Sequence, residues 1–296
     1  MAQTIDNINW YPGHMKKTRE LIRENLKMVD AVVEVTDARI PVSSRNPLID
    51  EILGNKPRII ALNKSDLADS ASCKSWISWF EQQGFEAVSM NANSGSGIKD
   101  LLRILEKMER EKNSASAVKR PFRLMIVGVP NVGKSSLINR MTGRKSAKTG
   151  DKPGVTKGKQ WIKLSNGMQL LDTPGLLWPK FEDPKAGVNL AFCGSIKDEI
   201  MDLPTLGMEL IGVLGEHYPD LLMDRYKLEE IGQTPLETME AMAMKRGCIL
   251  PGKRIDYERI GRLVLDEFRA GKIGRITLEQ PPAGEQMRGS ADGEQR

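Results

Sequence analysis

The chain has 296 residues, of which 40% are hydrophobic and 28% charged, the balance of an ordinary globular protein. At roughly 150 residues per domain this length predicts about two domains, and the apolar content excludes long-range disorder and fibrous classes. The net charge of +5 gives by itself only a hint of a polyanionic partner.

No stretch approaches the roughly 18 apolar residues of a membrane span. Asp6 and other polar residues interrupt the N-terminus, where a secretion signal needs an apolar run. We therefore expect a cytoplasmic protein without a membrane span. Cys73, Cys193 and Cys248 lie far apart without CxxC spacing, which favours buried reduced thiols over a zinc site or disulfides.

The first part of the chain alternates predicted strands and helices. Apolar, β-branched runs predict strands at 28–36, 58–62, 85–90, 122–127, 159–164 and 168–172. Helical spacing predicts helices at 71–83 and 97–112 and directly after a glycine-rich loop at 128–135. Residues 113–120 are small and polar, typical of a linker. The alternation predicts an α/β fold with a mostly parallel sheet covered on both faces.

The pattern changes beyond about Pro179. Helices are expected at 187–197, 202–217, 235–247 and 256–270, followed only by a doubtful strand near 275–279. This predicts an α/β domain at 1–180 and an all-α domain at 181–280. The tail at 281–296 is rich in Pro, Gly and polar residues, and we expect it to be disordered.

The segment 128–135, GVPNVGKS, fits the pattern GxxxxGK[ST] between a strand and a helix. Such a loop offers consecutive backbone N–H groups to a phosphate chain, and the following helix adds its positive end. Lys134 is expected to reach the β- and γ-phosphates, and Ser135 to ligate Mg²⁺. Further nucleotide contacts are expected from Asn131, Val132, Gly133 and Ser136. The alternative is a plain glycine turn, which the matching flanks disfavour.

A second phosphate loop is expected at Asp172-Thr173-Pro174-Gly175, directly after a predicted strand. Asp172 can hold Mg²⁺ through water, and the N–H of Gly175 can bond the γ-phosphate. The tetrapeptide alone is also a common turn.

The segment Asn63-Lys64-Ser65-Asp66 fits NKxD at the end of a strand. Asp66 can accept hydrogen bonds from guanine N1–H and N2–H₂, a donor pair that adenine lacks. Asn63 and Lys64 are expected to support the base and the phosphate loop. Ser89 and Asn91, after the next predicted strand, are expected in a partner loop over guanine O6. With the phosphate loop, this motif predicts GTP over ATP.

These motifs resemble those of the GTPase superfamily, but the guanine elements precede the phosphate elements. The order predicts a P-loop GTPase fold with circularly permuted strands, which is feasible because strands pair in space and not by sequence order. More narrowly, the chain is similar to the ribosome biogenesis GTPase A (RbgA/YlqF) family. The resemblance lies in WYPGHM at 10–15, DARIP at 37–41, PGVT at 153–156 and DTPGLLWPK at 172–180.

The resemblance implies several further roles. Thr156 corresponds to the switch threonine that ligates Mg²⁺, and Asn131 to the asparagine of potassium-stimulated GTPases. Leu176 cannot orient a catalytic water, and His14 is implied for that task, the alternative being that it only docks the N-terminal arm. The implied catalytic residues are therefore His14, Lys134 and Thr156. The metal ligands are Ser135, Thr156, Asp172 through water, and Asn131 for K⁺.

Two basic runs agree with an RNA partner. Residues 138–163 carry eight Lys or Arg against one acidic residue, and residues 244–275 carry nine against four. The resemblance implies a monomeric GTPase that assists assembly of the large (50S) ribosomal subunit, binds 23S-type rRNA through its helical domain, and is stimulated by the subunit and K⁺. The alternative is a nonenzymatic RNA-binding module that holds GTP structurally.

Overall fold

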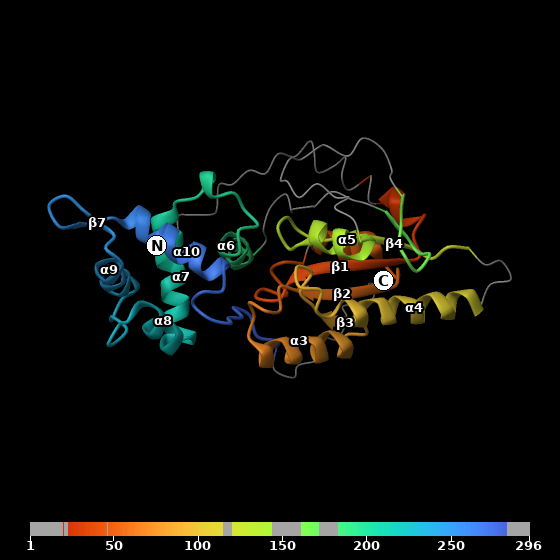
Figure 1. Cartoon of the computed structure of the whole chain (residues 1–296), viewed down its shortest axis with the longest axis horizontal. Coiled ribbons are helices and arrows are strands. Elements are labelled where there is room, and N and C mark those ends of the chain that lie inside the picture. Colours follow the sequence, from red (N-terminus) through yellow and green to blue (C-terminus); the bar gives the residue numbers. More distant parts are fainter. Residues whose placement is uncertain are drawn as a thin grey trace, which may run out of the picture.

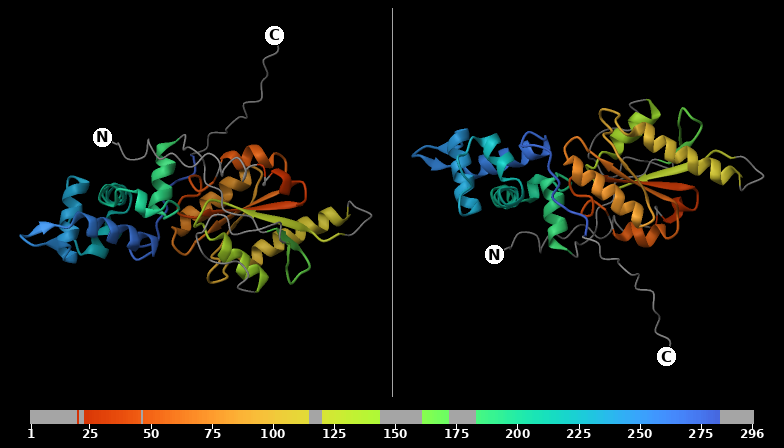
Figure 2. Two further views of the ribbon diagram at one scale, coloured as in Figure 1. Left: turned by 90° about the horizontal axis from the view of Figure 1, so that it is seen from above. Right: turned by 90° about the horizontal axis from the view of Figure 1, so that it is seen from below.

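A computed structural model of the chain describes residues 20, 23–45, 47–114, 120–143, 161–171 and 183–282. A sheet flanked by helices and a cluster of helices lie side by side along the long axis (Figures 1 and 2). The elements of the sheet region are β1 (Ala31–Asp37), α2 (Pro47–Leu53), β2 (Arg58–Asn63), α3 (Ser70–Gln82), β3 (Glu86–Ser89), α4 (Ile98–Ser114), β4 (Arg123–Val127), α5 (Lys134–Thr142), β5 (Trp161–Lys163) and β6 (Gln169–Leu171). The strands expected here are confirmed with shifted ends, whereas the short helix α2 was not expected.

The sheet has the order β3-β2-β1-β4-β6-β5. All neighbours are parallel except β5 and β6, which form an antiparallel hairpin. The hairpin turn at 165–167 is confirmed by the bond from Leu164 N–H to the Met168 carbonyl, 2.8 Å. Strands β2 and β4 flank β1, so loops that are distant in the sequence leave the same edge of the sheet.

Alternate side chains of the central strands enter different apolar layers. Val33 and Val35 of β1 pack in the cluster that includes α4 and α5, whereas Val32 packs against α2. On β2, Ile60 and Leu62 pack against α3, where Trp76 and Phe80 are buried. This period of two is what a parallel sheet covered on both faces requires, and it confirms the expected layering.

The second region contains α6 (Pro184–Phe192), a short 3₁₀ helix (Asp198–Ile200), α7 (Leu203–His217), α8 (Pro219–Tyr226), α9 (Pro235–Arg246), a small hairpin of β7 (Ile249–Leu250) and β8 (Arg254–Ile255), and α10 (Tyr257–Arg269). The helix expected at 187–197 instead ends at Phe192, because Gly194 adopts φ +72°. Helix α8 and the hairpin were not expected. The doubtful strand at 275–279 is absent, because this segment bonds to two separate loops.

Helices α7 and α10 form the centre of this region and cross at two glycines. A Cβ on Gly207 would lie 2.6 Å from the Cα of Gly261, so the backbones approach more closely than any side chain permits. Leu210 and Leu214 of α7 and Val264 of α10 are buried in the shared core. The crossing fixes α10, whose last turn faces the sheet region.

The segment after α10 returns to the sheet region and bonds to the loops after β1 and β2. Ile276 N–H donates to the Leu67 carbonyl, 3.0 Å, and Leu278 N–H to the Arg39 carbonyl, 2.8 Å. The carboxylate of Glu279 then accepts from the backbone N–H groups of Val42, 2.6 Å, and Ser43, 3.0 Å. The segment therefore ties the two regions together.

We expect Glu279→Ala to lower the free energy of unfolding by roughly 2–3 kcal/mol, because it removes charge-assisted bonds and leaves the buried Ser43 N–H without its acceptor. Urea denaturation followed by tryptophan fluorescence measures the change. Glu258→Ala is the control, since Glu258 pairs with Arg262 at the exposed surface of α10, and its loss should change stability by less than about 1 kcal/mol. Equal midpoint shifts for the two variants would show that Glu279 contributes nothing special.

The three cysteines are free and buried, as expected. Burial raises the pKa of Cys73 to about 11 and that of Cys193 to about 12, so these thiols stay protonated near neutral pH and are poor nucleophiles.

Candidate nucleotide-binding site

Three loops implicated by the sequence leave the carboxyl ends of neighbouring parallel strands. The NKxD motif follows β2, the segment 90–97 follows β3, and the phosphate loop follows β4, with β1 between β2 and β4. In open α/β sheets, ligands bind outside the carboxyl ends of the strands. The permuted chain therefore brings its guanine-type and phosphate-type motifs to one edge.

Asn63 joins these loops directly. Its side-chain Nδ2 donates to the Val132 carbonyl in the phosphate loop, 2.6 Å, and its Oδ1 accepts from Ala92 N–H, 2.9 Å. The backbone carbonyl of Asn63 also accepts from Ala38 N–H in the loop after β1, 2.8 Å. The side chain of Asn63 is buried. The three hydrogen bonds of this residue fix the phosphate loop relative to the loops after β1 and β3, and so relative to the predicted base site.

The phosphate loop needs glycine at two positions, because neighbouring groups leave no room for a Cβ there. Gly133 precedes α5 with φ +98°, and a Cβ there would lie 2.2 Å from Nδ2 of Asn63. A Cβ on Gly128 would lie 2.4 Å from the Val35 carbonyl oxygen. Lys134 and Ser135 occupy the first turn of α5, and Nζ of Lys134 donates to the Val129 carbonyl, 2.6 Å. N–H groups at a helix start together with a lysine and a hydroxyl fit a phosphate chain with Mg²⁺.

The predicted base side is built around Lys64 and Asp66. Lys64 takes φ +59°, and its Nζ forms an ion pair with Asp37 at the end of β1, 2.9 Å. The carboxylate of Asp66 is exposed in the turn that follows, where a base can reach it. Ser65 N–H donates to the Met90 carbonyl, 3.1 Å, so the NKxD turn is fixed to the loop after β3.

The loop after β3 is stabilised by hydrogen bonds within the loop. Oδ1 of Asn91 accepts from the N–H groups of Asn93, 2.8 Å, and Ser94, 3.1 Å, and Ser89 is half-buried at the end of β3. Arg140 of α5 donates to the carbonyls of Ala92, 3.2 Å, and Asn93. The sequence reasoning missed Ala92 and Arg140, because neither belongs to a motif.

Asn131 contacts the helical region. Its Nδ2 donates to the Gly194 carbonyl, 2.6 Å. The side-chain oxygen remains the atom through which this residue could ligate K⁺, a role that stays a prediction. His14, Thr156, Asp172 and Gly175 lie outside the described residues, so their predicted roles also stay predictions.

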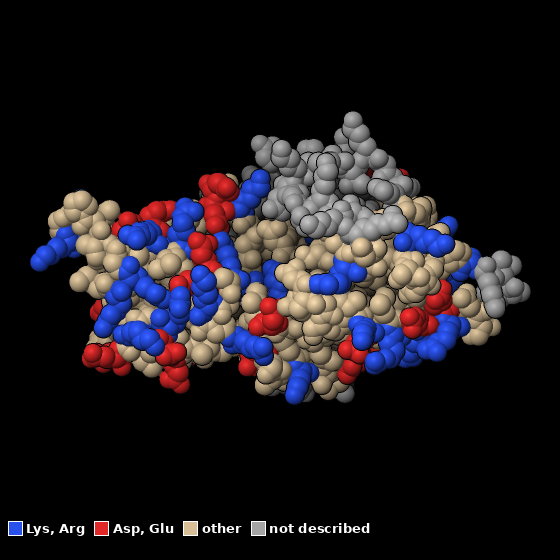
Figure 3. Space-filling model, viewed as in Figure 1, with Lys and Arg blue, Asp and Glu red and all other residues tan. Residues whose placement is uncertain are grey.

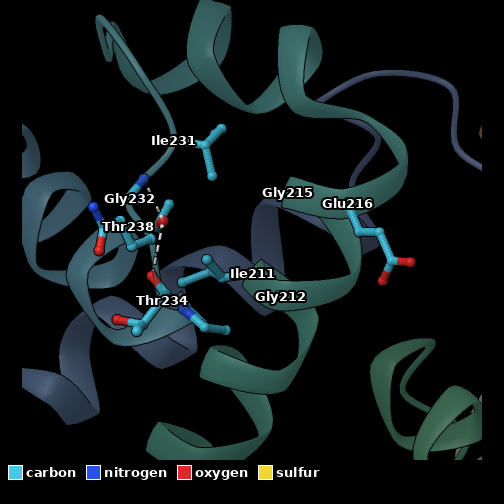
Figure 4. A pocket seen from close by; sticks show the side chains of 10 residues that line it. Ile211, Gly212, Gly215, Glu216, Ile231, Gly232, Thr234 and Thr238 are labelled. Atoms are coloured by element: carbon cyan, nitrogen blue, oxygen red, sulfur yellow. Dashed lines mark hydrogen bonds between the residues drawn. The ribbon is translucent and has the colours of Figure 1, made fainter.

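The hollows found in the described part of the chain lie away from the phosphate loop. One, of about 180 Å³, lies between α7 and the start of α9 (Figure 4). Two hydroxyls that line it are bonded within the protein: Oγ1 of Thr234 accepts from Glu237 N–H, 3.2 Å, and Oγ1 of Thr238 accepts from Gly232 N–H, 3.1 Å. The bond to Thr234 is part of the capping box that begins α9, so this hydroxyl stabilises the helix start.

Two negative findings concern metals and membranes. In the part of the chain that the structure describes, no three His, Cys, Asp or Glu side chains converge on a common point. Within the same ranges, every helix is too short or too polar to cross a bilayer.

A parallel sheet that carries a phosphate loop and an NKxD turn at one edge defines a P-loop GTPase with permuted order. Residues 123–211 match the family model described as 50S ribosome-binding GTPase. The chain is 47% identical over 285 residues to ribosome biogenesis GTPase A of Bacillus cereus, covering 95% of this chain and 96% of the relative. It is 33% identical to the mouse mitochondrial ribosome-associated GTPase 1, covering 94% of this chain and 92% of that one.

A solved relative has the same architecture. The crystal structure of GNP-bound YlqF from T. maritima matches with a TM-score of 0.65 and 31% identity, over 90% of this chain and 99% of that one. The chain therefore belongs to the ribosome biogenesis GTPase A family, and it is a GTPase that acts in ribosome biogenesis and uses guanine nucleotide with Mg²⁺. A nonenzymatic module that holds GTP only structurally is not supported.

Proposed function

We propose that the chain assists late assembly of the large (50S) ribosomal subunit by binding 23S-type rRNA through its helical region, in a manner controlled by GTP. It acts as a monomer in the cytoplasm. The observation that carries the proposal is the arrangement of basic side chains on the helical region, which Figure 3 shows from one side.

The structure sorts the nine basic residues of 244–275 into two groups. Arg246 forms an ion pair with Glu267, and Arg269 forms a bidentate ion pair with Asp198. Both arginines therefore stabilise the helical region. The others are exposed: Lys245, Lys253, Arg254, Arg259, Arg262, Lys272 and Arg275. Exposed cations of this density offer contacts to a phosphate backbone, and binding would release counterions. Arg140, from the other run, is instead bonded to the loop after β3.

The proposal gives each predicted site residue a role toward the nucleotide. Lys134 contacts the β- and γ-phosphates, while Ser135 and Thr156 ligate Mg²⁺ and Asp172 holds it through water. Asp66 reads guanine, with Asn63 and Lys64 in support. Asn131 ligates K⁺, and His14 orients the attacking water. The N–H groups of Val132, Gly133, Ser136 and Gly175 and the loop of Ser89 and Asn91 complete the nucleotide contacts. Turnover is stimulated by the ribosomal subunit and by K⁺.

Cosedimentation with large-subunit precursors tests the proposal. We expect binding with a nonhydrolysable GTP analogue to exceed binding with GDP, because the γ-phosphate orders the loops around Thr156 and Gly175. Binding should weaken steeply between 50 and 200 mM salt, by roughly 10³ for about six phosphate contacts. Equal binding with both nucleotides would contradict the switch, and binding that is insensitive to salt would contradict the RNA contact.

A further inference from the structure

A buried group of charges lies behind the NKxD turn. Asp37 and Arg39 are each about 1% exposed. The guanidinium of Arg39 donates two parallel bonds to the carboxylate of Asp37, from Nε to Oδ1 at 2.9 Å and from Nη2 to Oδ2 at 2.8 Å. Oδ2 of Asp37 also pairs with Nζ of Lys64, 2.9 Å. One carboxylate thus holds a rigid guanidinium on one side and a lysine of the nucleotide site on the other.

The charges are held firmly ionised. Burial alone would raise the pKa of Asp37, but Arg39 and Lys64 more than offset it and keep that pKa well below its usual range. Burial likewise disfavours the charged form of Arg39, and Asp37 reverses this, so its pKa lies above the ordinary value. Because a buried ion pair seldom stabilises a fold more than apolar side chains of equal volume, stability alone gives little reason for this group. Its contact with Lys64 gives a functional one.

Arg39 also touches the helical region. Its guanidinium lies over the ring of Phe268 in α10, 5.0 Å from the centroid, and its backbone carbonyl accepts from Leu278 N–H. The next residue of α10, Arg269, donates to the carbonyls of Phe192, 3.0 Å, and Ala191, 2.9 Å. These bonds fix the end of α6 just before Gly194, the residue whose carbonyl accepts from Asn131. The last turn of α10 is therefore connected to both nucleotide loops.

We propose that Asp37 is a positioning residue for guanine nucleotide binding. Asp37 is held by Arg39, which itself lies over Phe268 of α10, and it fixes Lys64 beside the base. Through this chain of contacts, nucleotide affinity is coupled to the docking of α10. The inference rests on the proposed role of Lys64 at the base. It gives the helical region a direct route to the nucleotide, so a partner that shifts α10 changes nucleotide affinity without touching the site.

A neutral replacement of the pair separates positioning from folding. In the double variant Asp37→Asn/Arg39→Gln, both members of the fully buried pair become neutral amides, whereas Lys64, whose side chain is 22% exposed, keeps its charge and loses its counter-ion. We expect the urea midpoint to stay near that of the wild type. The Kd for GDP and the KM for GTP should both rise about tenfold, the loss expected for one charge-assisted bond, while kcat at saturating GTP changes less than twofold. Unchanged affinity in the folded variant would overturn the proposal.

A second pair of variants keeps the test valid if the double variant does not fold. Phe268→Leu keeps all the charges and removes only the ring beneath Arg39. Its matched control is Tyr226→Leu, since Tyr226 is equally buried and carries Arg246 over its ring at the same 5.0 Å. We expect GDP to dissociate about threefold faster from Phe268→Leu, in keeping with a lost cation–π contact, and no faster from the control. Equal rates in both variants would overturn the coupling to α10.

The wild-type arm separates this inference from the proposed function. If the wild-type chain bound GDP no better than ADP, the proposed base site would be wrong, whatever the affinities of the variants. If the wild type selects GDP and both the double variant and Phe268→Leu retain its affinity, the site stands and only the role of Asp37 fails.

Discussion

Gly133→Ala is expected to weaken GDP binding by about 100-fold or more. At φ +98° an L-residue is strained, and such strain costs on the order of 1–3 kcal/mol. The added Cβ would also lie 2.2 Å from Nδ2 of Asn63, so the bond from that amide to the Val132 carbonyl must break, at a further cost of about 1 kcal/mol. Relief of both requires the loop to leave the conformation that exposes its N–H groups. Isothermal titration with GDP measures the loss, at about 1.4 kcal/mol per tenfold.

The matched control for this variant lies at the other end of the same helix. Gly143 also has positive φ, +65°, but no atom lies within 4 Å of a Cβ built there. Gly143→Ala should therefore cost about 1 kcal/mol in stability and leave GDP affinity within twofold. If Gly133→Ala bound GDP as tightly as this control, the contact between Asn63 and the phosphate loop would have no part in forming the site.

The permuted order of the nucleotide-binding motifs could be predicted because each motif carries its own local signature. The run VVEV before Asp37 and the run RIIALN before Lys64 are apolar and β-branched, and each ends in residues typical of a loop. The glycine pattern at 128–135 marks both a strand end and a helix start. Because the carboxyl ends of parallel strands share one edge, the meeting of Asn63 with the phosphate loop followed from the sequence, and the bond to Val132 confirms it.

The contacts that complete the site could not be predicted in this way. Arg140 reaches the carbonyl of Ala92 across 48 positions of the chain, and Asn131 reaches the carbonyl of Gly194 across 63. A carbonyl acceptor leaves no trace in the side-chain sequence, so neither partner has a signature. The same holds for the segment after α10, whose apolar alternation resembles a strand although its N–H groups bond to two separate loops.

The end of α6 shows a different limit. The spacing of apolar residues continues past Phe192, and periodicity alone therefore predicts a helix that continues to residue 197. The left-handed backbone of Gly194 ends it instead and directs a carbonyl at Asn131. Glycine in a helical pattern is ambiguous until the neighbours are known, and here the ending of the helix is what connects α6 to the phosphate loop.

Asp66→Asn is expected to change the base that the enzyme accepts. A carboxylate offers two acceptors, which match the N1–H and N2–H₂ donors of guanine. An asparagine offers one acceptor and one donor, which match the N1–H and C2 carbonyl of xanthine. Since a site built to hydrogen-bond its substrate rejects a mismatched analogue strongly, the preference for GTP over xanthosine triphosphate should reverse by a factor on the order of 10³. Initial rates of phosphate release with each nucleotide measure kcat/KM.

The control for this exchange is Asp100→Asn, at an exposed aspartate in the first turn of α4, which should leave the preference for GTP as in the wild type. Two results are informative beyond the reversal itself. If Asp66→Asn lost GTP without gaining xanthosine triphosphate, the carboxylate would hold the turn and not read the base. If Asp66→Asn kept its preference for GTP, the base would lie elsewhere, and the NKxD turn beside the phosphate loop would only stabilise the fold. Only a reversal with kcat largely preserved agrees with one purine triphosphate held between the two loops that Asn63 joins.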